Sequence, residues 1–187
     1  MFDNLLYTTN DLGANICESD LRFAMETLEP LAPNVIVEIG TYRGGSARLW
    51  NALFSPSVII TIDALKMADL DDAPGIHYLH GQPSQNAETL DNVRRILDGR
   101  EIDFLFIDGG HLYPEVKADF EMYYPLVRAG GAIMFHDVYY DIPGRVEVVK
   151  YIPELMTAHE VKMSKPGHGV SGVGIIVKND IRSVRGS

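Results

Sequence analysis

The chain has 187 residues and a formal net charge of −10, from 26 acidic and 16 basic residues, and 46% of it is hydrophobic. This length fits one compact domain, and the composition excludes a disordered or fibrous chain. The acidic balance argues against a polyanionic partner, because nucleic-acid-binding proteins need a basic surface. We therefore expect a single globular domain, residues 1–187, that binds no nucleic acid.

Cys17 is the only cysteine, so one chain can form neither an internal disulfide nor a thiolate metal cluster. The first residues lack the basic start and apolar run of a secretory signal, and no apolar run approaches about 18 residues. We therefore expect a cytoplasmic protein that has no membrane partner.

The first predicted element is a helix at residues 19–28, which we expect to end at Glu29-Pro30. From residue 34 onwards, short apolar runs alternate with helical stretches, a pattern typical of a parallel sheet covered on both faces. The predicted strands are residues 35–39, 58–63, 76–79, 104–108 and 132–136, and the predicted helices between them are residues 45–53, 84–97 and 114–127. This alternation predicts an α/β fold with helices on both faces of the sheet.

Two of these helices carry start signals, since Ser84 can cap a helix and Pro114 suits a first turn. In the helix at 114–127, core positions are predicted by a recurrence at three- and four-residue spacing of Val116, Phe120, Tyr123 or Tyr124, and Val127. Farther along, a helix at 146–157 and two strands at 159–163 and 174–178 are predicted, and the strands form a mixed edge of the sheet. The domain thus divides into an N-terminal helical segment (1–33), a core (34–137) and a C-terminal helix and hairpin (138–187).

A turn rich in glycine follows the first strand and contains Glu38, Gly40, Thr41 and Gly44. Glycines let the backbone approach a ligand closely, and the start of the next helix offers free N–H groups. The spacing E-x-G-x-x-x-G differs from the dinucleotide fingerprint G-x-G-x-x-G, which disfavours NAD. The turn favours a nucleoside-type cofactor, and a tight turn without a ligand is the alternative.

The next candidates follow the second and third strands. Asp63 lies about 20 residues beyond the glycines, where an acid can accept hydrogen bonds from both ribose hydroxyls of an adenosine. Gln82 and Ser84 are placed to meet the adenine. The alternatives are a turn residue for Asp63 and a helix cap for Ser84.

A complete G-x-G-x-x-G string also occurs, at Gly167, Gly169 and Gly172. It follows Lys165-Pro166 instead of a strand and leads into an apolar run instead of a helix. Because the dinucleotide fingerprint requires a strand before it and a helix after it, we interpret this string as a hairpin loop.

Two apolar strands each end in an aspartate, Asp108 and Asp137. Ligands of an open parallel sheet bind beyond the carboxyl ends of its strands, so both carboxylates are expected to face one crevice. Neighbouring carboxylates repel each other unless a cation lies between them, which suggests a divalent metal or a cationic ligand.

His111 follows Asp108 across two glycines, so its imidazole can lie over the same crevice. Histidine side chains titrate near neutral pH, which suits a general base that takes the proton of an attacking hydroxyl. One alternative is that His111 is only a surface residue. Another is that the chain is an iron-dependent oxygenase, in which His111, His136 and one aspartate would form the two-histidine, one-carboxylate set of iron ligands.

Taken together, residues 34–138 resemble class I methyltransferases related to the macrolide sugar O-methyltransferases and the cephalosporin-hydroxylase-like proteins. The most specific match is the run Phe106-Ile-Asp-Gly-Gly-His-x-Tyr113, followed by Asp119, Pro125-Leu126, Gly130-Gly131 and His136-Asp137. The resemblance implies a Rossmann-like, mostly parallel seven-stranded sheet with an antiparallel last strand.

The resemblance also implies a set of ligands. S-adenosylmethionine would lie across the Gly40 turn with its ribose on Asp63, and Asp108 is a further expected cofactor contact. Magnesium would take the positions that match Asp108, His136 and Asp137, with His111 as base. Some relatives carry an acid where this chain has His136, so a weaker affinity, a different metal, or an orienting role for His136 all remain open.

The expected activity is transfer of a methyl group to a hydroxyl of a small molecule, a sugar or an aromatic compound. The acceptor is expected among residues 1–17, 66–74 and 139–145. Because the short chain leaves little room for a cap over the acceptor, we expect a homo-oligomer. A protein that binds S-adenosylmethionine without turnover is the remaining alternative.

Overall fold

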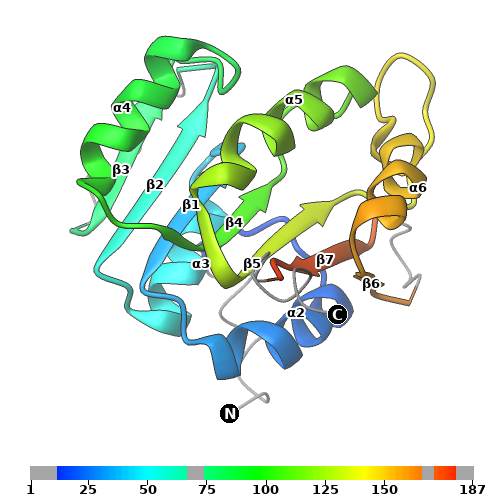
Figure 1. The fold of residues 1–187 in the computed structure, drawn as a ribbon, viewed down its shortest axis with the longest axis horizontal. Helices are drawn as coiled ribbons and strands as arrows, with labels where there is room; N and C mark the ends of the chain where they lie inside the picture. The colour runs from blue at the N-terminus through cyan, green and yellow to red at the C-terminus, as the bar shows by residue number, and fades with distance from the viewer. Residues whose placement is uncertain (1–11, 67–73, 166–170, 180–187) are drawn as a thin grey trace, which may run out of the picture.

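The computed structural model describes residues 12–66, 74–165 and 171–179 (Figure 1). Its helices are α2 (Glu18–Leu31), α3 (Gly45–Phe54), α4 (Ala87–Leu97), α5 (Tyr113–Tyr123) and α6 (Val148–Ala158), with a 3-10 turn η2 (Tyr124–Leu126) after α5. Its strands are β1 (Val35–Ile39), β2 (Val58–Asp63), β3 (Ile76–His80), β4 (Ile102–Ile107), β5 (Val127–His136), β6 (Val161–Met163) and β7 (Val173–Val177).

The strands form a seven-stranded sheet in the order β3-β2-β1-β4-β5-β7-β6, which can be followed across Figure 1. Strands β1 to β5 pair in parallel, and β7 pairs antiparallel with both β5 and β6. The expected mostly parallel sheet with an antiparallel last strand is confirmed. Because these strands are parallel to one another, the carboxyl ends of β1, β2, β4 and β5 lie at one edge of the sheet.

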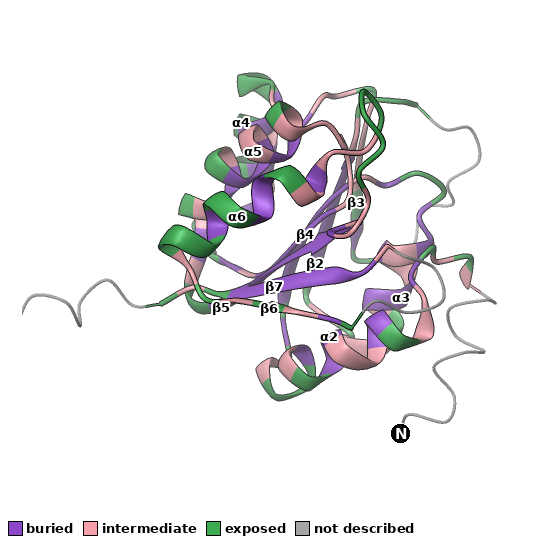
Figure 2. Cartoon of the chain, turned by 90° about the vertical axis from the view of Figure 1, so that its right-hand side faces the viewer, coloured by how far each residue is buried: buried purple, intermediate pink, exposed green. Residues whose placement is uncertain are grey.

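Helices cover the sheet on both sides, as the edge-on view in Figure 2 shows. Apolar side chains of α4, α5 and α6 pack on one face, and those of α2 and α3 pack on the other. Strands β1 and β2 are buried except for Asp63 at the end of β2, which explains why their sequences are mostly apolar. Val116, Phe120 and Tyr123 are buried in the first layer, which confirms these positions of the predicted stripe, whereas Val127 is buried in β5 and not in the helix.

Several predicted helix boundaries differ from the structure. Helix α2 continues through Pro30 to Leu31, because a proline in the last turn removes only one of the remaining hydrogen bonds. The helix predicted to run to Val127 ends instead at Tyr123, because Pro125 has no backbone N–H to continue the hydrogen bonds of the α-helix, and the chain passes into the 3-10 turn η2. Val127 is therefore the first residue of β5.

Ser84 is not a helix cap, since α4 begins at Ala87 after Asn86. The hydroxyl of Ser84 donates instead to Asp119. Gly167 and Gly169 of the predicted hairpin loop lie outside the described residues. Within the described ranges, none of the helices combines the length and the apolar character that crossing a bilayer requires.

Candidate active site

A cavity of about 600 Å³ lies beyond the carboxyl ends of the parallel strands. It spans the point between β1 and β4 where the strand order reverses, the usual ligand position in an open α/β sheet. Its volume falls in the range of small-molecule sites. Eight residues singled out from the sequence line it: Gly40, Thr41, Asp63, Ser84, Asp108, His111, His136 and Asp137.

The predicted contact Glu38 lies behind the cavity wall with none of its surface exposed. Its Oε1 accepts a hydrogen bond from the hydroxyl of Thr61 at 2.7 Å, and the hydroxyls of Thr61 and Thr41 also lie 2.7 Å apart. Burial raises the pKa of Glu38 to about 8, and the hydrogen bond from Thr61 only partly offsets this. Glu38 therefore supports Thr41, which does line the cavity.

The glycines of the first turn serve the packing of neighbouring backbone. At Gly40, φ is 103°, and a Cβ there would overlap the backbone carbonyl of Asp108. A Cβ at Gly45 would overlap the carbonyl of Gly13 in the segment that precedes α2. Gly44 adopts a φ of 70° as the residue before α3 and does not line the cavity. The absent side chains thus let β1 and β4 end side by side and let residues 13–16 form a wall.

Asp63 ends β2 and holds two backbone segments at the mouth of the cavity. Its Oδ2 accepts a hydrogen bond from the backbone N–H of Tyr42 at 2.7 Å, and its Oδ1 accepts one from that of Leu65 at 2.8 Å. Each carboxylate oxygen accepts more than one hydrogen bond, so both retain capacity for a ligand hydroxyl. The side chains of Tyr42 and Leu65 are exposed and line the cavity beside Asp63.

Of the predicted adenine contacts, Ser84 lines the cavity and Gln82 does not. The side chain of Gln82 accepts a hydrogen bond from Asn92 of α4 at 2.9 Å. Gln85 takes the position at the cavity wall, and the sequence reasoning missed it. We call Asp63, Ser84 and Gln85 the β2 side of the cavity.

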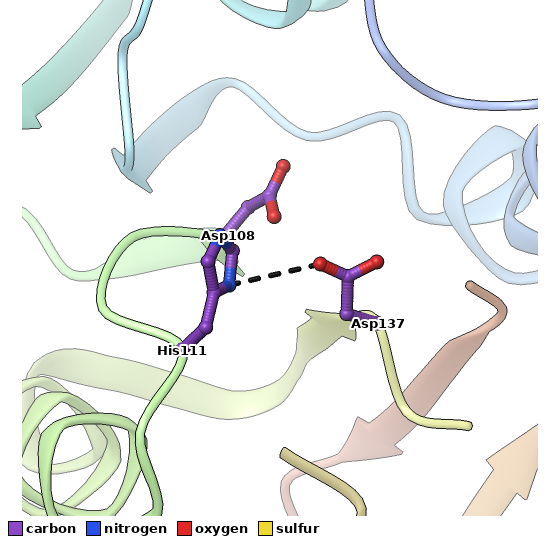
Figure 3. Close-up of side chains that lie close together, drawn as sticks. All are labelled: Asp108, His111 and Asp137. Carbon is purple, nitrogen blue, oxygen red and sulfur yellow. Dashed lines mark ion pairs between the residues drawn. The ribbon is translucent and has the colours of Figure 1, made fainter. Parts of the chain in front are cut away.

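Asp108, His111, His136 and Asp137 form the opposite side, which we call the β5 side. The Nδ1 of His136 lies 3.2 Å from Oδ1 of Asp108 and 3.3 Å from Oδ1 of Asp137. The Nδ1 of His111 lies 3.7 Å from Oδ2 of Asp137. Figure 3 shows His111 and the two carboxylates converging from the loop after β4 and from the end of β5. The predicted convergence of these residues is therefore present in the structure.

The charges of the β5 side stabilise one another. Burial alone lowers the pKa of His136, but hydrogen bonds to Asp108 and Asp137 and their negative charges outweigh it and raise the pKa to about 10. For Asp137 the directions are reversed. Burial alone raises the pKa of this carboxyl group, but the hydrogen bond to His136 and the charges of His136 and His111 outweigh burial and lower the pKa overall. At neutral pH the site therefore holds a histidinium between two carboxylates.

Two features show what this side can bind. Ligand atoms of Asp108, His111 and Asp137 all lie within 4.8 Å of one another. Two carboxylates and an imidazole that face a cavity fit a divalent cation. His136 is 8% exposed and directs its Nδ1 at the carboxylates. Its contacts therefore fit a residue that orients the two aspartates, as the sequence left open.

Residues 37–138 match the family model described as "Methyltransferase domain". The chain belongs to this family. The methyltransferase domain is 28% identical over 108 residues to mycinamicin VI 2''-O-methyltransferase of Micromonospora griseorubida, covering 55% of the chain and 26% of that protein. It is 26% identical over 149 residues to rhamnosyl O-methyltransferase of Mycobacterium tuberculosis, covering 73% of the chain and 60% of that protein.

Among solved structures, the methyltransferase domain is similar to the MycE methyltransferase of the mycinamycin biosynthetic pathway in complex with Mg, SAH and mycinamycin VI. The TM-score is 0.75 at 19% identity, over 98% of this chain and 56% of that one. This likeness confirms the methyltransferase fold. The chain spans 60% or less of the two curated relatives described above.

Proposed function

We propose that the chain is an S-adenosylmethionine-dependent methyltransferase that transfers a methyl group to a hydroxyl of a small molecule with the help of a divalent cation. Family membership supports methyl transfer. The cofactor and the cation are supported by a single observation: one cavity is lined by Asp63 on one side and by the cluster of Asp108, His111 and Asp137 on the other. The names of the relatives support a sugar hydroxyl as acceptor.

The β2 side would bind the nucleoside part of S-adenosylmethionine. Asp63 accepts hydrogen bonds from the ribose hydroxyls, and its bonds to the backbone at Tyr42 and Leu65 keep its carboxylate in place. The side chains of Tyr42 and Leu65 supply apolar surface to the adenosine. Ser84 and Gln85 lie at the wall that the base would reach. The cofactor is thus bound chiefly by groups that carry out no chemistry.

The β5 side would perform the reaction. S-adenosylmethionine supplies an electrophilic methyl group on a sulfonium, and a divalent cation, held by Asp108 and Asp137, would lower the pKa of the acceptor hydroxyl. His111 takes the proton that leaves this hydroxyl as its oxygen bonds to the methyl carbon and the carbon–sulfur bond breaks. Asp137, 3.7 Å from Nδ1 of His111, stabilises the imidazolium that results.

His136 acts through its neighbours. Its Nδ1 is directed at both carboxylates, and its side chain is 9% exposed, whereas that of His111 is 36% exposed. We therefore assign proton transfer to His111 and positioning of Asp108 and Asp137 to His136. The acceptor would enter beside Asn15 and Ile16, which line the cavity within the predicted acceptor segment. Residues 139–145 do not line it, and residues 1–11 and 67–73 lie outside the described chain.

The test is a methyl-transfer assay with a panel of hydroxylated sugars and aromatic compounds, read by mass spectrometry. The protein, S-adenosylmethionine and magnesium are incubated with each acceptor, with and without a chelator. We expect a methylated product and equimolar S-adenosylhomocysteine from at least one acceptor, and loss of both with the chelator. Product that forms equally well with the chelator would contradict the role of the cation. Size-exclusion chromatography with light scattering tests the expected homo-oligomer.

A further inference from the structure

A buried carboxyl group lies directly behind the β2 side of the cavity. Asp119 of α5 has none of its surface exposed. Its Oδ1 accepts hydrogen bonds from Oγ of Ser84 at 2.6 Å and from Nε2 of Gln85 at 2.7 Å. Ser84 and Gln85 line the cavity, whereas Asp119 does not. Asp119 therefore contacts the cavity only through the two residues that form its wall.

These bonds fix what the wall can offer to a ligand. The hydroxyl hydrogen of Ser84 is directed at Asp119, so only the lone pairs of the Ser84 oxygen are available to a ligand. The amide nitrogen of Gln85 faces Asp119, so its carbonyl oxygen is the atom turned away from Asp119. Both residues thus present hydrogen-bond acceptors, and the partner that suits acceptors is a donor on the ligand.

A second contact from the same helix holds this wall. The hydroxyl of Tyr123, one turn after Asp119 in α5, donates to the backbone carbonyl of Ser84 at 2.9 Å. Both residues are fully buried and lie four positions apart, so they share one face of the helix. Helix α5 therefore fixes both the backbone and the side-chain orientation of the wall.

The buried carboxyl group is costly to the fold. Burial raises the pKa of Asp119 to about 7, and its Oδ2 has no hydrogen-bond partner among the described residues. Oδ1 can accept both hydrogen bonds whether or not Oδ2 carries a proton. If this position served packing alone, an apolar side chain would cost less free energy of burial. The two hydrogen bonds to the wall are therefore the reason for a polar residue here.

We propose that Asp119 is a positioning residue that makes Ser84 and Gln85 present acceptors to the cavity, so that the wall selects a purine with an exocyclic amino group over one with an exocyclic oxo group. This inference rests on the proposed function, because it assigns this wall to the base of S-adenosylmethionine. It adds a residue outside the cavity that determines which base is bound.

The experiment compares the Kd of S-adenosylhomocysteine with that of S-inosylhomocysteine by calorimetry. The wild-type chain is expected to bind the adenosyl compound about tenfold more tightly, the equivalent of roughly 1.4 kcal/mol. Asp119→Leu is expected to bring the ratio close to one. Asp119→Asn keeps an acceptor oxygen toward Ser84 and Gln85 and is expected to retain the ratio.

Asp20→Asn is the matched control. Asp20 is also a buried helical aspartate, 1% exposed, and accepts a hydrogen bond from Ser164 at 2.7 Å, but it does not line or support the cavity. The control is expected to leave the ratio unchanged, since a general loss of stability does not alter discrimination between two bases.

The possible outcomes separate this inference from the proposed function. A folded Asp119→Leu variant that keeps the wild-type ratio overturns the role of Asp119, as does a wild-type chain that binds both compounds equally. If Asp119→Leu fails to fold, Gln85→Met is measured instead. This variant must bind the two compounds with nearly equal Kd, and a Gln85→Met variant that keeps the wild-type ratio of Kd values overturns the inference. A wild-type chain that binds neither compound contradicts the proposed function and this inference together.

Discussion

The two sides of the cavity satisfy their carboxyl groups in different ways. On the β2 side, Asp63 accepts hydrogen bonds from two backbone N–H groups, and Asp119, which lies behind this side, accepts them from the hydroxyl of Ser84 and the amide of Gln85. On the β5 side, Asp108 and Asp137 face each other and two histidines. The β2 side is thus a binding wall fixed by the fold, whereas the β5 side concentrates charge that a cation and a reacting hydroxyl can use.

Both sides of the cavity contain a residue in the left-handed region that residues other than glycine rarely adopt. Asp137 has a φ of 59°, and Tyr42, whose N–H donates to Asp63, has a φ of 45°. Such conformations concentrate at functional sites, where the surrounding structure maintains them. The following substitutions test whether binding and chemistry are divided between the two sides.

The largest effect is expected from Asp137→Asn on the β5 side. Methyl transfer should fall by about three orders of magnitude, because a cation contributes several kcal/mol of charge stabilisation. Asparagine tolerates the left-handed backbone, so the fold should survive. Initial rates give the loss, and calorimetry should show the affinity for S-adenosylhomocysteine unchanged within about threefold. Asp91→Asn, on the exposed side of α4, serves as control. An Asp137→Asn variant with wild-type activity would contradict the assignment of a cation site to Asp137.

His111→Ala should reduce kcat by about 10²- to 10⁴-fold, the range typical of a lost general base. Cofactor affinity should stay at the wild-type value, because His111 lies on the β5 side. Magnesium affinity, measured by calorimetry on the same variant, separates the two chemical roles. A variant that loses both turnover and magnesium affinity would identify His111 as a ligand of the cation instead of a base.

Asp63→Asn should weaken binding of S-adenosylhomocysteine by about 10- to 100-fold, since hydrogen bonds to a charged group contribute roughly 1.5–3 kcal/mol. At saturating cofactor, kcat should stay within about threefold of the wild-type value. Steady-state kinetics gives both values. A large fall in kcat with an unchanged KM would contradict the assignment of Asp63 to binding alone.

The last prediction concerns stability and not catalysis. The pKa of Glu38 rises from 4.5 to about 8 in the folded chain, so the folded state holds this proton more tightly than the unfolded state. The free energy of unfolding should therefore fall as the pH rises through this interval, by up to about 1.4 kcal/mol per pH unit. Urea unfolding at several pH values should show a shallower fall for Glu38→Gln. Glu88→Gln, at an exposed position, should keep the wild-type slope.

Much of the fold could be predicted because its signals are local. Strands buried on both faces are mostly apolar, so β1 and β2 have the bounds predicted for them. Asp108, His111 and Asp137 could be brought together because parallel strands end at one edge. The two C-terminal strands were expected as a hairpin at a mixed edge of the sheet, and the family resemblance added the seven-stranded sheet with an antiparallel last strand.

The remaining site residues depend on contacts between distant segments. Gln82 and Gln85 are both polar residues after β3, and their partners in the fold distinguish them. Gln85 donates to Asp119, 34 residues farther along the chain, and lines the cavity, whereas Gln82 accepts from Asn92 and does not. Glu38 was predicted to contact the cofactor from its place in the glycine-rich turn, yet the alternation of β1 turns it toward Thr61. The sequence located the turn but not the direction of its side chains.

Calorimetric titration with S-adenosylhomocysteine and with NAD, each with and without magnesium, tests the central claim most directly. We predict that S-adenosylhomocysteine binds under both conditions, because Asp63 and the β2 side hold it without the cation, and that NAD does not bind. Binding of NAD in the absence of any binding of S-adenosylhomocysteine would contradict the account.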